Sequence, residues 1–268
     1  MKKYLLILLV FLVSGCVNNS NRMNYEDGSI IYFDVTTGKS CTNYHEDNSK
    51  SGYNGISDKK TTENQNGCLK FYAFNDNGEN TLNLLLDHNT SDDIIWTSGS
   101  NNMGPKEVIT QLANDTNAWQ GTESPNNYEG IGGSNLKYTV DYTSKTARLI
   151  TAEEIAKITD NTSWTPNSSK GYYLDTKTND ASNTCKKGNT TKCKYSWLYD
   201  RTSTFCEDYG CLNNSDGFTW GYWTATASSR NYSIGWSVDK TGNLDFHYVD
   251  FNLIGVRPVI EVLKSKLN

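Results

Sequence analysis

The clearest pattern of hydrophobic and polar positions lies in the last part of the chain, residues 218–263. Short runs rich in Trp, Tyr, Phe, Val and Ile are separated there by polar or glycine-containing connections at residues 229–231, 239–242 and 252–255. Runs of β-branched and aromatic residues between such connections are typical of consecutive antiparallel strands. The pattern therefore predicts a small β-meander of three or four strands.

Earlier parts of the chain contain further strand-like runs. Residues 68–74 (CLKFYAF) and 81–87 (TLNLLLD) flank a connection that contains Asn77 and Gly78, which favours a hairpin. The remaining predicted strands are shorter and stand apart from one another: residues 29–35, 94–97, 148–150 and 194–200.

Two segments carry a helical pattern. In residues 105–119, apolar side chains recur at helical spacing behind Pro105, which suits a first turn. A second helix is expected after Thr151, because Thr151 and Glu154 have the spacing of a capping box, and it should stop at residues 160–161. Two modest helices among many short antiparallel strands predict an α+β fold.

The start of the chain has the pattern of a lipoprotein signal peptide. Two lysines precede an apolar run that is too short to span a membrane comfortably, and Ser14, Gly15 and Cys16 follow it. The end of this segment matches the bacterial lipobox, in which the cysteine thiol is acylated and the cysteine becomes the first residue. Two or three acyl chains on Cys16 would anchor the chain stably in a membrane.

This signal predicts the organisation of the whole chain. Residues 1–15 form the signal peptide, residues 16–27 a lipidated flexible tether, and residues 28–268 a single extracellular domain. The expected location is the extracellular face of the bacterial cell membrane, with the membrane as a partner through the lipid anchor on Cys16.

Composition narrows the set of partners. The chain of 268 residues has a formal net charge of −5 at pH 7 and lacks a basic run, which argues against a nucleic-acid partner. Its 17 Tyr and seven Trp favour sheets that are stabilised by aromatic pairs across neighbouring strands.

Six cysteines remain when Cys16 is set aside, and an even number in an exported chain favours disulfides. The spacing suggests that neighbours in the sequence pair: Cys41 with Cys68, Cys185 with Cys193, and Cys206 with Cys211. A zinc site is the alternative, but the chain has no Cys-x-x-Cys spacing and no histidine near the last four cysteines. We expect neither a metal nor a cofactor.

The closing motifs resemble those of a known family. Residues 223–226 (WTAT), residues 236–239 (WSVD) ahead of Gly242, and residues 255–259 (GVRPV) follow one another in that order. This order is similar to that of C-type-lectin-like domains, in the branch shared by formylglycine-generating-enzyme-like domains and bacterial surface proteins. The resemblance is specific only in this last part of the chain, and it implies a C-type-lectin-like fold.

The functional sites of that family do not carry over to this chain. Calcium-dependent sugar binding in the lectin branch uses a W-N-D strand with an E-P-N or Q-P-D loop, and this chain has neither. The formylglycine-generating branch uses a reactive cysteine pair in its C-terminal part, whereas residues 212–268 contain no cysteine. The resemblance therefore bears on the fold and not on an activity.

Residues suited to catalysis are sparse. The best candidate for a catalytic base with a carboxylate partner is His88 beside Asp87, but neighbouring residues on a strand point to opposite faces. The chain also lacks the G-x-S-x-G motif of a nucleophile elbow. Residues 75–79 supply oxygen ligands without the rest of a calcium loop, which favours an ordinary turn. We expect no catalytic residues and no enzymatic activity.

The candidate ligand-binding residues lie in loops where lectin-like folds present a variable surface. They are Arg230, Tyr232, Phe246, His247 and Tyr248. Arg257 is expected to have a structural role, paired with a carboxylate and stacked on Trp223 or Trp236.

Together these observations predict a lipid-anchored surface module that binds a glycan or a protein. The alternatives are an exported enzyme of the formylglycine-generating or glycan-modifying type, and a structural surface component that links only to itself.

Overall fold

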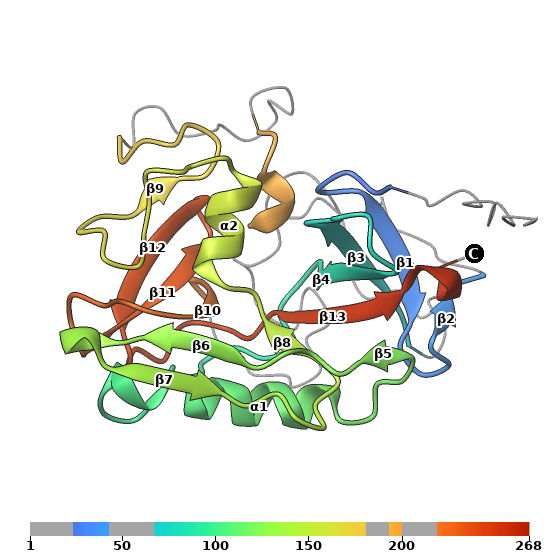
Figure 1. The fold of residues 1–268 in the computed structure, drawn as a ribbon, viewed down its shortest axis with the longest axis horizontal. Coiled ribbons are helices and arrows are strands. Elements are labelled where there is room, and N and C mark those ends of the chain that lie inside the picture. Colours follow the sequence, from blue (N-terminus) through green and yellow to red (C-terminus); the bar gives the residue numbers. More distant parts are fainter. Residues whose placement is uncertain (1–23, 43–66, 181–192, 200–218, 268) are drawn as a thin grey trace, which may run out of the picture.

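The computed structural model describes residues 24–42, 67–180, 193–199 and 219–267. Within these ranges the chain forms antiparallel sheets with two α-helices, so the predicted α+β class is confirmed (Figure 1).

The largest sheet has the strand order β2-β1-β3-β4-β13-β5, and β8 also pairs with β13. Its strands are β1 (Ile30–Asp34), β2 (Lys39–Ser40), β3 (Cys68–Phe74), β4 (Thr81–Leu86), β5 (Thr122–Glu123), β8 (Arg148–Leu149) and β13 (Pro258–Leu263). The predicted hairpin is confirmed, because β3 and β4 pair as neighbours. Gly78 in its connection has a φ of 79°, a backbone conformation that favours glycine.

The second sheet contains the meander. Strands β10 (Gly221–Ala227), β11 (Ile234–Asp239) and β12 (Asn243–Tyr248) follow one another, and β9 (Tyr172–Tyr173) joins the far edge. The fourth predicted strand is not part of the meander, because β13 pairs with β4 in the large sheet. Pro258 lies at the first position of β13, where its missing N–H breaks no ladder.

A two-stranded ladder and several helical turns complete the fold. The ladder is β6 (Tyr128–Ile131) with β7 (Lys137–Val140), and the helices are α1 (Lys106–Thr116) and α2 (Ala152–Ile158). The predicted capping box of α2 is confirmed, because the Thr151 hydroxyl accepts from the Glu154 amide while the Glu154 carboxylate accepts from the Thr151 amide. The 3-10 turns are η1 (Asn101–Met103), η2 (Gly133–Asn135), η4 (Ser196–Leu198) and η5 (Lys264–Lys266).

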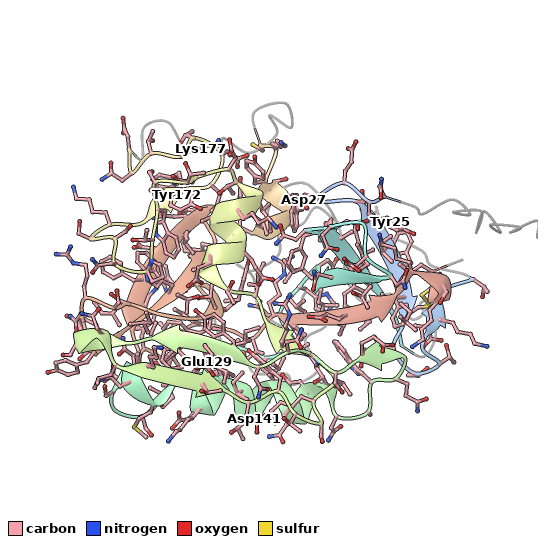
Figure 2. All side chains as sticks on the ribbon, viewed as in Figure 1. Tyr25, Asp27, Glu129, Asp141, Tyr172 and Lys177 are labelled. Atoms are coloured by element: carbon pink, nitrogen blue, oxygen red, sulfur yellow. A yellow bond between two sulfur atoms is a disulfide. The ribbon has the colours of Figure 1, made fainter. Side chains whose placement is uncertain are left out.

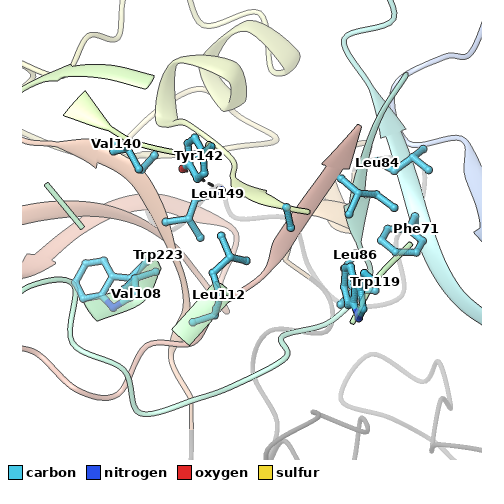
Figure 3. Packing of buried hydrophobic residues seen from close by; sticks show 14 of the residues in the cluster. Phe71, Leu84, Leu86, Val108, Leu112, Trp119, Val140, Tyr142, Leu149 and Trp223 are labelled. Carbon is cyan, nitrogen blue, oxygen red and sulfur yellow. Dashed lines mark hydrogen bonds between the residues drawn. The ribbon is translucent and has the colours of Figure 1, made fainter. Parts of the chain in front are cut away.

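Strands β4 and β13 are buried on both faces and therefore join two hydrophobic clusters. Leu84, Leu86 and Ile260 point into the cluster drawn in Figure 3, which α1 and Trp223 complete. Leu85 and Val259 point to the opposite side, where α2 and the meander form the second cluster. The alternation of these residues along each strand follows from the two-residue period of a strand.

Two predicted strands are wrong. Residues 94–97 form no ladder, and their backbone donates separate hydrogen bonds to the meander side: Ile94 N to Ile254 O, and Trp96 N and Thr97 N both to Val249 O. The described part of residues 194–200 contains the turn η4 in place of a strand. The carbonyls of η4 accept from the Arg257 side chain, a long-range contact that no local pattern reveals.

Candidate binding surface

Three of the predicted ligand-binding residues lie exposed at one end of the molecule. Arg230 and Tyr232 belong to the loop between β10 and β11, and Tyr248 ends β12 beside the start of β11. The exposed fractions of Tyr232 and Tyr248 are 59% and 66%, so both rings are available to a partner.

The other two predicted residues, Phe246 and His247, are partly buried and contact neighbouring side chains. Phe246 packs edge-on against Trp236, with ring centroids 5.4 Å apart. His247 stacks on Phe251 at 5.1 Å, and its Nδ1 lies 2.9 Å from the Ser237 hydroxyl. Burial lowers the pKa of His247, against the opposing effect of Asp245, so a neutral ring is favoured. The structure therefore places Phe246 and His247 in packing and hydrogen-bonding roles.

Asn101, a residue that the sequence did not single out, holds the loop between β10 and β11. Its backbone N–H donates to Tyr232 O at 2.7 Å. Its side-chain Nδ2 lies within hydrogen-bonding distance of three loop carbonyls: Ser228 O at 2.9 Å, Asn231 O at 2.8 Å and Ile234 O at 2.7 Å. The buried side-chain amide of Asn101 thus takes the place of hydrogen bonds from a neighbouring strand, and it holds the loop that carries the exposed side chains.

The turn between β6 and β7 packs directly against the same loop. The Asn101 Oδ1 accepts from the Gly133 amide at 2.9 Å. A Cβ on Gly133 would lie 2.3 Å from the backbone nitrogen of Tyr232, so only glycine permits this approach. The close contact brings η1, the β6–β7 turn and the β10–β11 loop together at the left of Figure 1.

Most of the exposed large hydrophobic side chains gather at this end. The described residues expose seven of them, and five belong to these neighbouring segments: Met103 at 44%, Ile131 at 45%, Leu136 at 54%, Tyr232 at 59% and Tyr248 at 66%. We call these five residues the apolar tip. Single exposed apolar side chains are ordinary, but a group on adjoining turns is typical of an interaction surface.

Exposed charged side chains of both signs lie close to members of the apolar tip in the sequence. Lys106, Lys137 and Arg230 are exposed cations near its members in the sequence, and Glu129 and Asp250 are exposed acids. On the outer face of the β6–β7 ladder, Lys137 lies opposite Ile131 and Glu129 opposite Thr139. The margin of the tip is therefore mixed in charge, although the whole chain is acidic.

The residues expected to be structural lie in the core. Trp223 and Trp236 are fully buried, and Trp223 donates to Ile94 O at 2.7 Å. Arg257 is fully buried too, but its described hydrogen bonds run to backbone carbonyls in place of the expected carboxylate: Leu86 O, Asp87 O, Trp197 O and Leu198 O. Its guanidinium lies 5.1 Å from the Tyr222 ring, so its aromatic partner is Tyr222 and neither tryptophan.

Asp87 and His88 do contact each other, contrary to the expectation from strand alternation. His88 Nδ1 meets Asp87 Oδ1, because β4 ends at Leu86 and the alternation ends with it. A pair of this kind needs a nucleophile or a substrate beside it before it has a catalytic meaning.

A hollow of about 340 Å³ lies between α1 and the segment before η1, lined by Asp93, Ile94, Ile95, Glu107, Thr110 and Gln111. Burial raises the pKa of Glu107, but hydrogen bonds from Ser98 outweigh it and the net pKa is lowered. A carboxyl held in its charged form is poorly suited to act as a general acid. Among the described residues, no three His, Cys, Asp or Glu side chains form a group that could hold a metal ion.

The disulfide between Cys41 and Cys68 is confirmed. Cys193 is also disulfide-bonded, and its partner lies outside the described residues. Cys16, Cys185, Cys206 and Cys211 lie outside them as well.

Comparison with known proteins found no relative of this chain. No protein-family model matches the chain, and no curated protein or solved structure is significantly similar to it. In the part of the chain that the structure describes, no helix has the length and apolar character needed to cross a membrane.

Proposed function

We propose that this chain is a lipid-anchored surface module of bacteria that binds a partner through the apolar tip. The lipobox ending in Cys16 supports the anchor. The order of the closing motifs supports a C-type-lectin-like arrangement within the α+β fold. The glycan or protein partner expected from the sequence would meet Arg230, Tyr232 and Tyr248, and Met103, Ile131 and Leu136 extend that surface.

The observation that carries this proposal is the position of the tip relative to the first described residues of the chain. The described chain begins on the side where Tyr25 lies, close to β1, whereas Glu129 at the margin of the tip lies toward the opposite side (Figure 2). An anchor at Cys16 would thus hold one end of the molecule near the membrane while the tip faces outward. A surface that projects away from its anchor is available to partners outside the cell.

The proposed lipid anchor is tested by measuring acylation and membrane association of the protein in cells, with and without Cys16. A Cys16→Ser variant should lose incorporation of labelled palmitate and move from the membrane fraction to a non-membrane fraction. Unchanged membrane association of this variant would contradict the proposed anchor.

The binding role is tested with the chain from Val17 onward, which contains every described residue. It is applied to arrays of glycans and purified proteins, first with calcium and then with a chelator. A Tyr232→Ser/Tyr248→Ser variant should lose at least about ten-fold in affinity for any hit, since exposed aromatic side chains are frequent hot spots. The control is Ile30→Ser, an exposed apolar residue on β1 that should bind normally. Equal binding by all three proteins would exclude the tip as the binding surface.

A further inference from the structure

The chemistry of the tip narrows the class of partner. Three of its five members are exposed aliphatic or thioether side chains: Met103 ends η1, Ile131 ends β6 and Leu136 follows η2. Sugar rings are held by aromatic faces and by several converging polar groups, which these three side chains do not supply. Aromatic and methionine side chains in an apolar centre with a polar rim are the composition of a protein interface.

The charges argue for a partner of mixed charge. An anionic membrane is bound by a surface in which cations dominate. Here Glu129 lies on the same outer face of the ladder as Ile131, and Asp250 follows Tyr248 by two residues. These acids would face an anionic membrane unfavourably, so the margin fits a surface that offers both signs of charge.

We propose that the partner of the apolar tip is a second copy of this chain, bound tip to tip. In a two-fold contact the same patch meets itself, so it must be self-complementary. The apolar centre of one copy would cover that of the other, and the cations Lys106, Lys137 and Arg230 would face the acids Glu129 and Asp250 across the two-fold axis. The hydrogen bonds of Asn101 fix the loop beforehand, which reduces the entropy lost on association.

This inference rests on the proposed function, because the anchor decides what a tip-to-tip contact does. Because the described chain begins near β1, away from the tip, two copies joined by their tips would carry their N-terminal ends on opposite sides of the pair. They would therefore join two facing membranes, and the protein would act as a homophilic adhesion module.

The first experiment is sedimentation velocity of the chain from Val17 onward over a range of concentrations. A reversible monomer–dimer equilibrium is expected. Leu136→Ser should weaken it by at least about ten-fold, since a buried apolar anchor is lost, and Ile30→Ser should leave it unchanged. A monomer at every concentration, or a dimer that Leu136→Ser does not weaken, would overturn the inference.

Charge reversal tests the self-complementary margin directly. A variant with Lys106→Glu, Lys137→Glu and Arg230→Glu has an acidic margin, and a variant with Glu129→Lys and Asp250→Lys has a basic one. Each alone should be monomeric, and their mixture should form a heterodimer. Failure of the mixture to associate would contradict the two-fold pairing.

The adhesion role is tested with beads that carry the chain through its N-terminal end. Beads with the wild-type chain should aggregate, and beads with Leu136→Ser should stay dispersed. Dispersed wild-type beads would overturn the inference, and so would binding to anionic phospholipid vesicles in place of aggregation. If the chain stays monomeric but binds an array component through Tyr232 and Tyr248, the self-association fails while the proposed binding function stands.

Discussion

Two buried polar side chains donate hydrogen bonds to backbone carbonyls of several segments at once. Arg257 serves the carbonyls at the end of β4 and in η4, and Asn101 serves those of the β10–β11 loop. Buried carbonyls need a donor, and a side chain that reaches several of them replaces a strand neighbour. The arginine stood out in the sequence because of the motif around it, whereas Asn101 had no pattern that marked it.

Removing the Arg257 side chain should be strongly destabilising. In Arg257→Met, four buried carbonyls lose donors, and the free energy of unfolding should fall by at least about 3 kcal/mol. Arg257→Lys should recover only part of this loss, because one ammonium group lacks the fork of the guanidinium. Urea denaturation monitored by tryptophan fluorescence measures the effect. Arg230→Met, at an exposed site, is the matched control, and equal stability of the two Met variants would refute the assigned role.

Changing Asn101 to Asp should disturb the tip with little change in volume. The carboxylate would face three carbonyl oxygens, and the free energy of unfolding should fall by roughly 2 kcal/mol. The amides of the β10–β11 loop should also exchange faster with deuterium, because their anchor is lost. Asn126→Asp, on an exposed asparagine, controls for the added charge. Unchanged exchange in the loop would show that other contacts hold it.

At the scale of the elements, local signals were sufficient for some parts of the fold. The β3–β4 hairpin and the capping box of α2 depend on residues close in sequence, and both were predicted with nearly correct bounds. The sheet that β13 joins depends on its pairing with β4, which is distant in sequence, so of the predicted three or four strands of the meander the fourth is wrong. Residues 94–97 (IIWT) have the composition of a strand, yet they lack a continuous neighbour.

The turn between β3 and β4 should contribute a pH-dependent part of the stability through Asp76. Its carboxylate accepts from Lys264 Nζ at 2.6 Å, and from the amides of Tyr25 and Gly78 at 2.9 Å each. Burial raises the pKa of Asp76, but these hydrogen bonds and the charge of Lys264 outweigh it, so the net pKa lies below the ordinary value of 3.8. A lowered pKa in the folded state stabilises the fold above the ordinary value, and this contribution is lost as the pH falls through the lowered one.

Asp76→Asn should therefore be less stable than the wild type at neutral pH, by roughly 1–3 kcal/mol. The difference should shrink as the pH falls below 3.8, because the wild-type carboxyl then becomes protonated. Urea denaturation of both proteins at a series of pH values measures it. A difference that stays constant across the series would exclude the carboxylate as its source.

At the scale of the whole molecule, the tip shows why a site is harder to predict than a strand. Arg230, Tyr232 and Tyr248 were expected to bind because they lie in loops of the closing motifs. Met103 and Leu136 belong to segments far away in sequence, and the contacts of Asn101 and Gly133 with the β10–β11 loop bring them to the same end. Phe246 and His247 alternate along β12 in the expected way, but neighbouring rings cover them.

The disulfide between Cys41 and Cys68 should stabilise the large sheet by restricting the unfolded chain. It links residues 27 positions apart, and a loop of that size corresponds to about 3.5 kcal/mol in the chain-entropy description. A Cys41→Ala/Cys68→Ala variant should lose stability of this order in urea denaturation, with its m-value reporting any change in the unfolded state. The variant isolates this bridge, whereas a reductant would also break the disulfide of Cys193. A loss below about 1 kcal/mol would contradict the expectation.

The two hydrophobic clusters should unfold together. Strands β4 and β13 supply alternate residues to both clusters. Unfolding of one cluster would therefore remove strands that the other cluster packs against. Arg257 adds a second link, since it lies beside β13 and binds carbonyls of β4 and η4. Calorimetry should therefore show one transition whose van't Hoff and calorimetric enthalpies agree. Val259→Ala and Ile260→Ala, which face different clusters, should each lower the midpoint of that single transition, and a separate second transition in either variant would show that the clusters are independent.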